Sequence, residues 1–135
     1  LEGQTEADVC IGDVFDLGTA RVELSQGRQP CWKLNLRFGL PDMARRVQDS
    51  GRTGWYLRVL QPGAVGAGDA LRLVARPNAD WPLSRVWRLL YCDPPDAGPL
   101  RAFAGLQGLS ASWRALALRR VETRRVEDWS PRLLG

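Results

Sequence analysis

The chain contains no histidine, the residue that most often carries proton transfer and metal binding near neutral pH. This absence excludes a Ser-His-Asp or Cys-His catalytic group made within these 135 residues, together with histidine-based metal sites. Acid–base chemistry by this chain therefore depends on Asp, Glu or Lys side chains, or on a bound cofactor.

Lysine is almost absent too, because Lys33 is the single lysine among 19 basic residues. Against 15 acidic residues the net charge is +4, and the excess is scattered along the chain. Duplex nucleic acid needs a concentrated basic patch, so we expect no nucleic-acid partner. A bias toward GC-rich codons explains the many arginines, and so does anion binding, since a guanidinium pairs with phosphate or carboxylate through two hydrogen bonds.

Long apolar runs are also missing. None approaches the roughly 20 residues that cross a bilayer, and Leu1-Glu2-Gly3 begins no signal peptide. Hydrophobic residues make up 44% and charged residues 25%, which is typical of a globular chain of one domain with a small appendage. We therefore predict a soluble, cytoplasmic protein without a membrane partner.

Cysteine occurs three times, at Cys10, Cys31 and Cys92, and these spacings match no zinc or disulfide framework. Cys10 lies in an apolar strand segment and Cys92 at the end of a helical segment, so we predict that both are core residues. Cys31 needs a separate explanation.

Cys31 lies in the stretch QGRQPCWKL, directly after Pro30 and between Arg28 and Lys33. Positive neighbours stabilise the thiolate, which is the reactive and metal-binding form of cysteine. A thiolate is also a good ligand for soft or high-valent transition metals. From these neighbours alone, a functional thiolate and a buried structural thiol both stay open.

The first part of the chain alternates apolar and polar residues as strands do. Residues 14–18 and 20–26 predict a hairpin with its turn at Gly18-Thr19, and residues 55–60 and 70–75 predict two more strands. The pattern V-x-x-G-D-x-[FL]-x-L occurs at residues 9–17 and again at 65–73, and each copy predicts a glycine turn that leads into a strand. A barrel built from similar pieces and a common turn used twice explain this repeat equally well.

Helical patterns follow. Residues 40–51 predict a short helix with Asp42 as its N-cap and Gly51 at its end. Beyond Pro77 apolar residues take helical spacing, which predicts three short helices, with caps at Ser84 and Ser110, in these segments: 84–92, 97–108 and 109–125. A bundle of this size is stable only if it packs on the rest of the chain.

The stretch SGRTGWYLRVL holds a second candidate site. Gly51 and Gly54 flank Arg52-Thr53, so exposed amides and a guanidinium in this loop can meet a phosphate. A two-glycine turn into a strand, with no ligand, is an equally simple interpretation.

The stretches VCIGDVF, SQGRQPCWKL, RFG and PDMARRVQDSGRTGWYLRVLQPGAVGAGD, with the helical tail, closely resemble the MOSC family, in its YiiM-type branch. The resemblance runs from about Asp8 to the C-terminus, and the motifs R-x-P-C-x-K-L and G-R-T-G-W-Y-x-R-V-L are specific. It implies a mainly β fold with α: the C-terminal half of a MOSC β-barrel-like domain over residues 1–80, then a three-helix (3-alpha) module over residues 81–135.

The resemblance also implies an activity. Members bind a molybdenum cofactor (molybdopterin) with a cysteine as metal ligand, and YiiM-type members reduce N-hydroxylated compounds, such as 6-N-hydroxylaminopurine, to amines. The motif cysteine corresponds to Cys31, which with Lys33 is our catalytic candidate. Arg28, Arg52 and Arg58 are candidates, with Cys31, for holding the cofactor, although Arg58 is equally explained as a strand surface residue.

Two departures from the family pattern stand out. Gly27 replaces a proline of the family, which loosens the loop without moving the thiol. The chain also aligns only with the part of the MOSC domain that follows a G-E-N motif, so we expect the N-terminal half, with a His-Gly segment, to lie outside these residues. The lack of histidine would then describe this stretch and not the enzyme. Unpaired strand edges would be covered by that half or by a second copy of the chain.

Electrons must come from an external donor protein, because no flavin or iron–sulfur motif is visible. Basic residues of the last helix form either a docking surface for an acidic redox protein or an ordinary solvated face: Arg119, Arg120, Arg124 and Arg125. The alternative function is a sulfur carrier with a persulfide on Cys31, or a cofactor-binding module without reductase activity.

Overall fold

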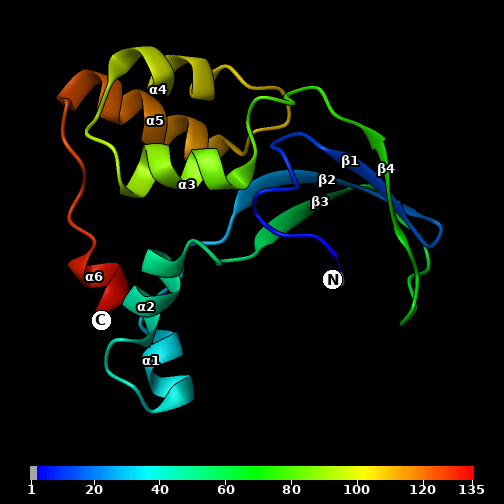
Figure 1. The fold of residues 1–135 in the computed structure, drawn as a ribbon, viewed down its shortest axis with the longest axis horizontal. Coiled ribbons are helices and arrows are strands. Elements are labelled where there is room, and N and C mark those ends of the chain that lie inside the picture. Colours follow the sequence, from blue (N-terminus) through cyan, green and yellow to red (C-terminus); the bar gives the residue numbers. More distant parts are fainter. Residues whose placement is uncertain (1–2) are drawn as a thin grey trace.

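The computed structural model describes residues 3–135, whose strands form one four-stranded antiparallel sheet. The strands are β1 (Val14–Leu17), β2 (Ala20–Gly27), β3 (Trp55–Gln61) and β4 (Leu71–Ala75). Their order in the sheet is β3-β2-β1-β4, which leaves β3 and β4 at the edges (Figure 1). All four strands lie where the alternation predicts them, and Leu17 pairs with Ala20 across the predicted hairpin turn.

Six helices lie within residues 3–135: α1 (Lys33–Phe38), α2 (Met43–Ser50), α3 (Leu83–Tyr91), α4 (Ala97–Ala104), α5 (Ala111–Thr123) and α6 (Ser130–Leu133). The pattern predicts α2 to α5 and misses α1 and α6. In α1 apolar residues alternate with polar ones as in a strand, and the helix buries no residue. Because α6 has four residues, no periodicity can reveal it. None of the described helices has the length and apolar character needed to cross a membrane.

One apolar core joins the sheet to the helices α3, α4 and α5, which lie together on one side of the molecule (Figure 1). Phe15 of β1 and Leu24 of β2 are fully buried in it. On the helical side Phe103 lies between two indoles, with ring centroids 5.7 Å from Trp81 and 5.9 Å from Trp113. The three-helix bundle therefore buries its apolar faces on the sheet, as its small size requires.

The sheet is not closed into a barrel within residues 3–135. Both edge strands expose apolar side chains, with Val59 on β3 at 59% and Val74 on β4 at 46% relative exposure. The predicted fold class, a partial barrel with β and α parts, is confirmed as this open sheet with its helices. Unpaired edge strands that expose apolar side chains are typical sites of pairing with another segment.

The two copies of the V-x-x-G-D pattern form the same turn. Asp13 Oδ2 accepts from the amide of Cys10 at 2.8 Å, and Asp69 Oδ2 accepts from the amide of Gly66 at 2.7 Å. Each aspartate amide also donates back to the carbonyl of that same residue. The strands that follow, β1 and β4, are neighbours in the sheet. The repeat is thus one turn geometry used twice at adjacent strands.

Two local predictions are wrong, and a third is confirmed in position only. Cys92 is exposed at the C-terminal end of α3, because the helix turns its other face to the core. The N-cap of α3 is Pro82, whose missing amide costs nothing at a helix start, and Ser84 lies within the first turn. Asp42 is the N-cap residue of α2, as predicted, but its side chain accepts no capping hydrogen bond, and its carboxylate pairs with Arg46 at 2.9 Å.

Other local predictions are confirmed. Gly51 ends α2 with a left-handed backbone at φ 68°, which glycine adopts without strain. Ser110 caps α5 by accepting from the amide of Trp113 at 3.3 Å. Cys10 is buried, with 3% of its surface exposed.

Candidate functional site

Cys31 lies in the short segment that joins β2 to α1, and its thiol is free and half-buried. Pro30, immediately before it, is fully buried, so the chain is anchored one residue from the sulfur. The carbonyl of Cys31 accepts from the amide of Leu34 at 2.9 Å, which begins the turn into α1. The thiol therefore lies at a bend that is held on both sides.

Both peptide groups that flank Cys31 are bonded to a single residue of α6. The carbonyl of Pro30 accepts from Nη1 of Arg132. The amide of Trp32 donates to the backbone carbonyl of Arg132 at 2.8 Å. Figure 1 shows α6 beside α2, in the same layer as α1.

Further polar bonds tie this layer together. Arg132 Nη2 donates to Oε1 of Gln48 at 2.6 Å, and the carbonyl of Gln48 accepts from the indole of Trp87 at 2.7 Å. Asn35 donates to the carbonyl of Leu133 at 2.9 Å and accepts from the first turn of α2 at 2.8 Å. These contacts connect α1, α2, α3 and α6 around the segment that carries Cys31.

The loop between α2 and β3 lies beside the Cys31 segment. The amide of Arg28 donates to the carbonyl of Gly54 at 2.8 Å, and Gly27 pairs with Trp55 in the sheet. Gly54 has a φ of 74°, and a Cβ there would have no atom within 4 Å. Arg52 lines a cavity of about 300 Å³ next to this loop. The two motifs are thus brought together at one end of the β2–β3 pair.

The predicted cations divide into two groups. Arg28, Lys33 and Arg52 are exposed, and none of them forms a salt bridge within residues 3–135. Arg58 instead pairs with Glu23 of β2, with 2.8 Å between Nη1 and Oε1. The first three are available to an anion, whereas Arg58 neutralises a carboxylate that is almost buried.

The surroundings of Cys10 and Cys92 raise the pKa of both thiols. Burial raises the pKa of Cys10, and the neighbouring charge of Asp13 raises it further. Partial desolvation also raises the pKa of Cys92, with Asp93 adding to the effect. Both environments disfavour the thiolate. Among the three cysteines, Cys31 alone combines partial exposure with two flanking cations.

No group of three or more His, Cys, Asp or Glu side chains in the described part of the chain is placed to hold a metal ion by itself. A free thiol in a segment that also carries exposed, unpaired cations suits a metal that arrives within an anionic organic cofactor. A cysteine would supply one metal ligand to such a group, and guanidinium groups would pair with its phosphate. The donor set of Cys31, Arg28, Lys33 and Arg52 fits such a group.

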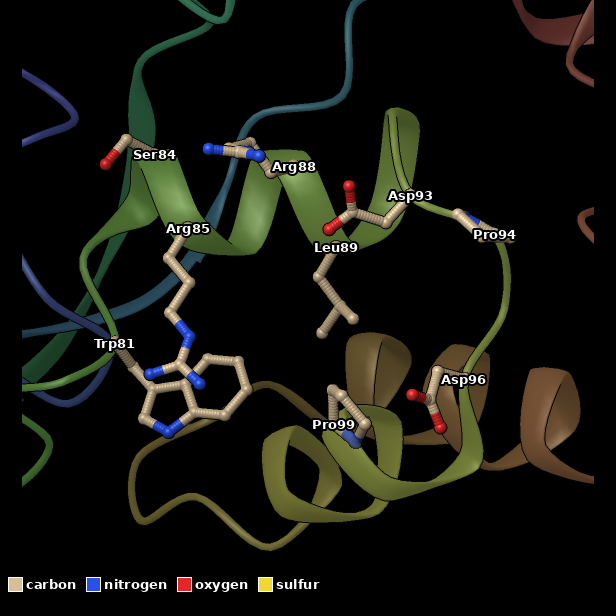
Figure 2. A pocket seen from close by; sticks show the side chains of 9 residues that line it. All are labelled: Trp81, Ser84, Arg85, Arg88, Leu89, Asp93, Pro94, Asp96 and Pro99. Atoms are coloured by element: carbon tan, nitrogen blue, oxygen red, sulfur yellow. The ribbon is translucent and has the colours of Figure 1, made fainter.

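A cavity of about 570 Å³ lies elsewhere, between α3 and α4. Figure 2 shows Arg85 stacked over Trp81, 4.1 Å from the ring centroid, at one end, and Asp93 and Asp96 at the other. Within residues 3–135, Cys31 lines neither this cavity nor three smaller ones of about 300 to 320 Å³. The thiol thus lies at the surface layer of the described residues, outside these cavities.

Arg120 was grouped with three other arginines as either a docking surface or a solvated face, and both alternatives require an exposed side chain, which Arg120 does not have. Its side chain is 2% exposed, and it donates to both carboxylate oxygens of Glu127, at 3.0 and 2.7 Å, and to the carbonyl of Leu90 at 2.7 Å. It therefore fixes the chain after α5 to α3. The remaining basic residues are exposed: Arg119, Arg124 and Arg125.

Sequence reasoning missed Arg132, Gln48 and Asn35. Arg132 is one arginine among many and lies 102 residues from Pro30, so no local pattern points to it. Gln48 lies within the predicted helix, where no sequence pattern shows that this polar side chain is 1% exposed. Asn35 lies in the helix that periodicity did not predict.

Comparison with known proteins gives two family matches along the chain. Residues 1–72 match the MOSC domain, and residues 81–124 match the YiiM-like, 3-alpha helix domain. Protein YiiM of Escherichia coli (strain K12) is 36% identical over 134 residues, which cover 99% of this chain and 59% of that protein. A protein named Reductase from Gibberella moniliformis is 40% identical over 87 residues, 64% of this chain and 16% of that protein.

Solved structures agree with these matches. The crystal structure of YiiM from Escherichia coli superimposes with a TM-score of 0.94 at 36% identity, over 98% of this chain and 66% of that one. YiiM from Geobacillus stearothermophilus gives 0.85 at 39% identity, over 88% and 61%. The chain spans about three-fifths of the length of the Escherichia coli relative. It belongs to the MOSC domain family, in the branch that carries the YiiM-like 3-alpha helix domain.

Proposed function

We propose that this chain is the cysteine-bearing part of a molybdenum-cofactor-dependent reductase that converts N-hydroxylated compounds, such as 6-N-hydroxylaminopurine, to amines. The observation that carries the proposal is Cys31, a free, half-buried thiol between Arg28 and Lys33 in a segment held from both sides. Membership of the MOSC family supports the cofactor class, and the Gibberella relative named Reductase supports the class of reaction.

Each residue has a separate task in this proposal. When bound, the cofactor supplies two electrons for cleavage of the N–O bond, which with two protons gives the amine and water. Cys31 holds the metal through its thiolate, and Arg28 and Arg52 bind the cofactor phosphate. Lys33, exposed at the first position of α1, gives a proton to the departing oxygen. Arg58 tunes the site only through Glu23, with which it is paired.

The exposed apolar strands support a second part of the proposal, in which a further segment of the same protein covers β3 and β4 and completes the pocket over Cys31. The relatives are longer than this chain, and the apolar side chains lie on the two edge strands of the open sheet. Hydrogen exchange at β3 amides should be slower in the complete protein than in residues 1–135 alone. Dimerisation of the complete protein through these strands would favour a second copy instead.

An external electron-donor protein is the remaining partner in the proposal. Arg119, Arg124 and Arg125 form an exposed basic end of α5 that complements an acidic redox protein. Changing these three arginines to glutamate should raise the donor concentration needed for half-maximal turnover. Unchanged donor dependence would remove this surface from the proposal.

The reaction is tested with the complete protein, produced in a host that makes the cofactor. The reduction of 6-N-hydroxylaminopurine should fall to background in Cys31→Ser, because the metal loses its protein ligand. Cys92→Ser is the matched control, since this exposed thiol lies outside the site, and should keep wild-type activity. Full activity in Cys31→Ser contradicts the proposal, and sulfide release from Cys31 on reduction would indicate a persulfide carrier.

A further inference from the structure

Arg132 contacts the peptide groups on both sides of Cys31. A peptide group is planar, so the only soft backbone rotations at Cys31 are those between its two flanking planes. The first plane carries the Pro30 carbonyl, which accepts from the Arg132 guanidinium. The second carries the Trp32 amide, which donates to the Arg132 carbonyl at 2.8 Å. Holding both planes fixes the direction in which the Cys31 side chain leaves the backbone.

The Arg132 side chain is itself anchored in the fold. Its second terminal nitrogen donates to the side chain of Gln48, a residue that is 1% exposed and whose backbone carbonyl accepts from the indole of Trp87 of α3. The guanidinium carbon also lies 6.0 Å from the centre of the Tyr91 ring. Because these partners come from α2 and α3, the position of Arg132 is set by the packed part of the molecule.

The backbone around Arg132 is held as well. Leu133 is 1% exposed, and its carbonyl accepts from Asn35 of α1 at 2.9 Å. A four-residue helix has no stability of its own, so α6 keeps its shape only through these contacts. The segment after α5 therefore contacts the loop that carries Cys31.

We propose that Arg132 is a positioning residue that fixes the direction in which the Cys31 side chain leaves the backbone, so that the C-terminal segment helps to build the site. The metal-ligand role of this thiol rests on the proposed function, whereas the positioning does not. A guanidinium suits the task because its planar set of donors reaches Pro30 and Gln48 at once, which an ammonium group on a flexible stem does less well.

The test uses Arg132→Met in the complete protein, made without cofactor so that the thiol is free. Methionine keeps an unbranched side chain and the backbone carbonyl but removes the guanidinium donors. Alkylation by iodoacetamide is followed at each cysteine by peptide mass spectrometry. Cys92 is exposed and serves as the reference thiol, and Cys10 is buried and reports unfolding.

We expect the labelling rate of Cys31 relative to Cys92 to rise about tenfold in Arg132→Met, because charge-assisted hydrogen bonds that limit local opening are lost. Cys10 should stay protected. The matched control is Arg101→Met, an exposed arginine of α4 with no side-chain hydrogen bond or salt bridge among residues 3–135, and it should leave the ratio unchanged. An unchanged ratio in Arg132→Met would overturn the proposal.

A second variant and a second readout keep the two proposals separate. Gln48→Met removes one anchor of Arg132 and should raise the labelling ratio of Cys31 to Cys92 by a smaller factor. If the ratio does not rise in this variant, the positioning proposal is contradicted. Labelling of Cys10 together with Cys31 would show that Arg132 supports the whole fold, which also overturns specific positioning. Wild-type protein from a cofactor-making host could lack molybdenum while the labelling ratio of Cys31 to Cys92 still rises in Arg132→Met. In that case the proposed function fails and the positioning stands.

Discussion

The core and the thiol layer of this molecule are stabilised by different interactions. The core joins β1 and β2 to α3, α4 and α5 through fully buried apolar side chains such as Phe15, Leu24 and Phe103. The thiol layer, made of α1, α2, α6 and the Cys31 segment, buries few apolar groups, and α1 buries none. Hydrogen bonds from Arg132 and its partners connect it. Burial thus sets stability in the core, whereas directional bonds set geometry near Cys31.

The largest effect that separates these two regions is expected in the core. Phe103→Ala removes a fully buried ring packed against Trp81 and Trp113, so the free energy of unfolding should fall by about 3–5 kcal/mol. Urea denaturation measures this loss. Under native conditions the alkylation ratio of Cys31 to Cys92 should stay at its wild-type value. A shift in that ratio as large as that of Arg132→Met would show that the two regions are coupled.

The turns at Asp13 and Asp69 have the same geometry but differ in burial, and we expect intermediate effects on the free energy of unfolding there. Asp13 is fully buried, pairs with Arg76 at 2.7 Å and accepts from the amide of Cys10, whereas Asp69 is exposed and caps the amide of Gly66. Asp13→Ala should therefore cost about 2–4 kcal/mol and Asp69→Ala about 1 kcal/mol or less. Chemical denaturation of both variants checks the order. Equal losses would mean that the turn, rather than its burial, determines the stability.

The smallest expected effect depends on pH. Burial raises the pKa of Glu127, but hydrogen bonds and charge from Arg120 outweigh it, so the pKa lies below its ordinary value of 4.5. A lowered folded-state pKa means that this pair stabilises the protein above pH 4.5 and that the contribution is lost as the pH falls through the folded value. Glu127→Gln should lower the melting temperature at neutral pH and flatten its decline below pH 4.5. Parallel melting curves for wild type and Glu127→Gln across this range would exclude the effect.

Much of the fold could be predicted from local patterns, because strand alternation and helical spacing are properties of neighbouring residues. The hairpin at Gly18-Thr19 and the cap at Ser110 follow from single residues that favour those geometries. Helix α1 could not be predicted, since its apolar residues alternate as in a strand. Gly39 ends it in the left-handed region, and at its start the amide of the N-cap residue Trp32 donates to the distant carbonyl of Arg132.

The residues of the candidate site also divide into those that could be identified from the sequence and those that could not. Cys31, Arg28 and Lys33 could be identified because they are neighbours in the chain. Arg132 could not, because its two bonds to the Cys31 segment join residues about a hundred positions apart. Arg120 shows the converse error: within a run of arginines on one helix, sequence does not distinguish the buried one, bonded to a carboxylate, from its exposed neighbours.

The most direct test of the central claim is the molybdenum content of the complete protein, purified from a host that makes the cofactor and measured by elemental analysis. Wild type and Cys92→Ser should each hold close to one molybdenum per protein, and Cys31→Ser should hold almost none, because its hydroxyl is a poor replacement for a thiolate ligand. Equal molybdenum in Cys31→Ser and wild type, with Cys10 still protected from alkylation in both, would contradict the account.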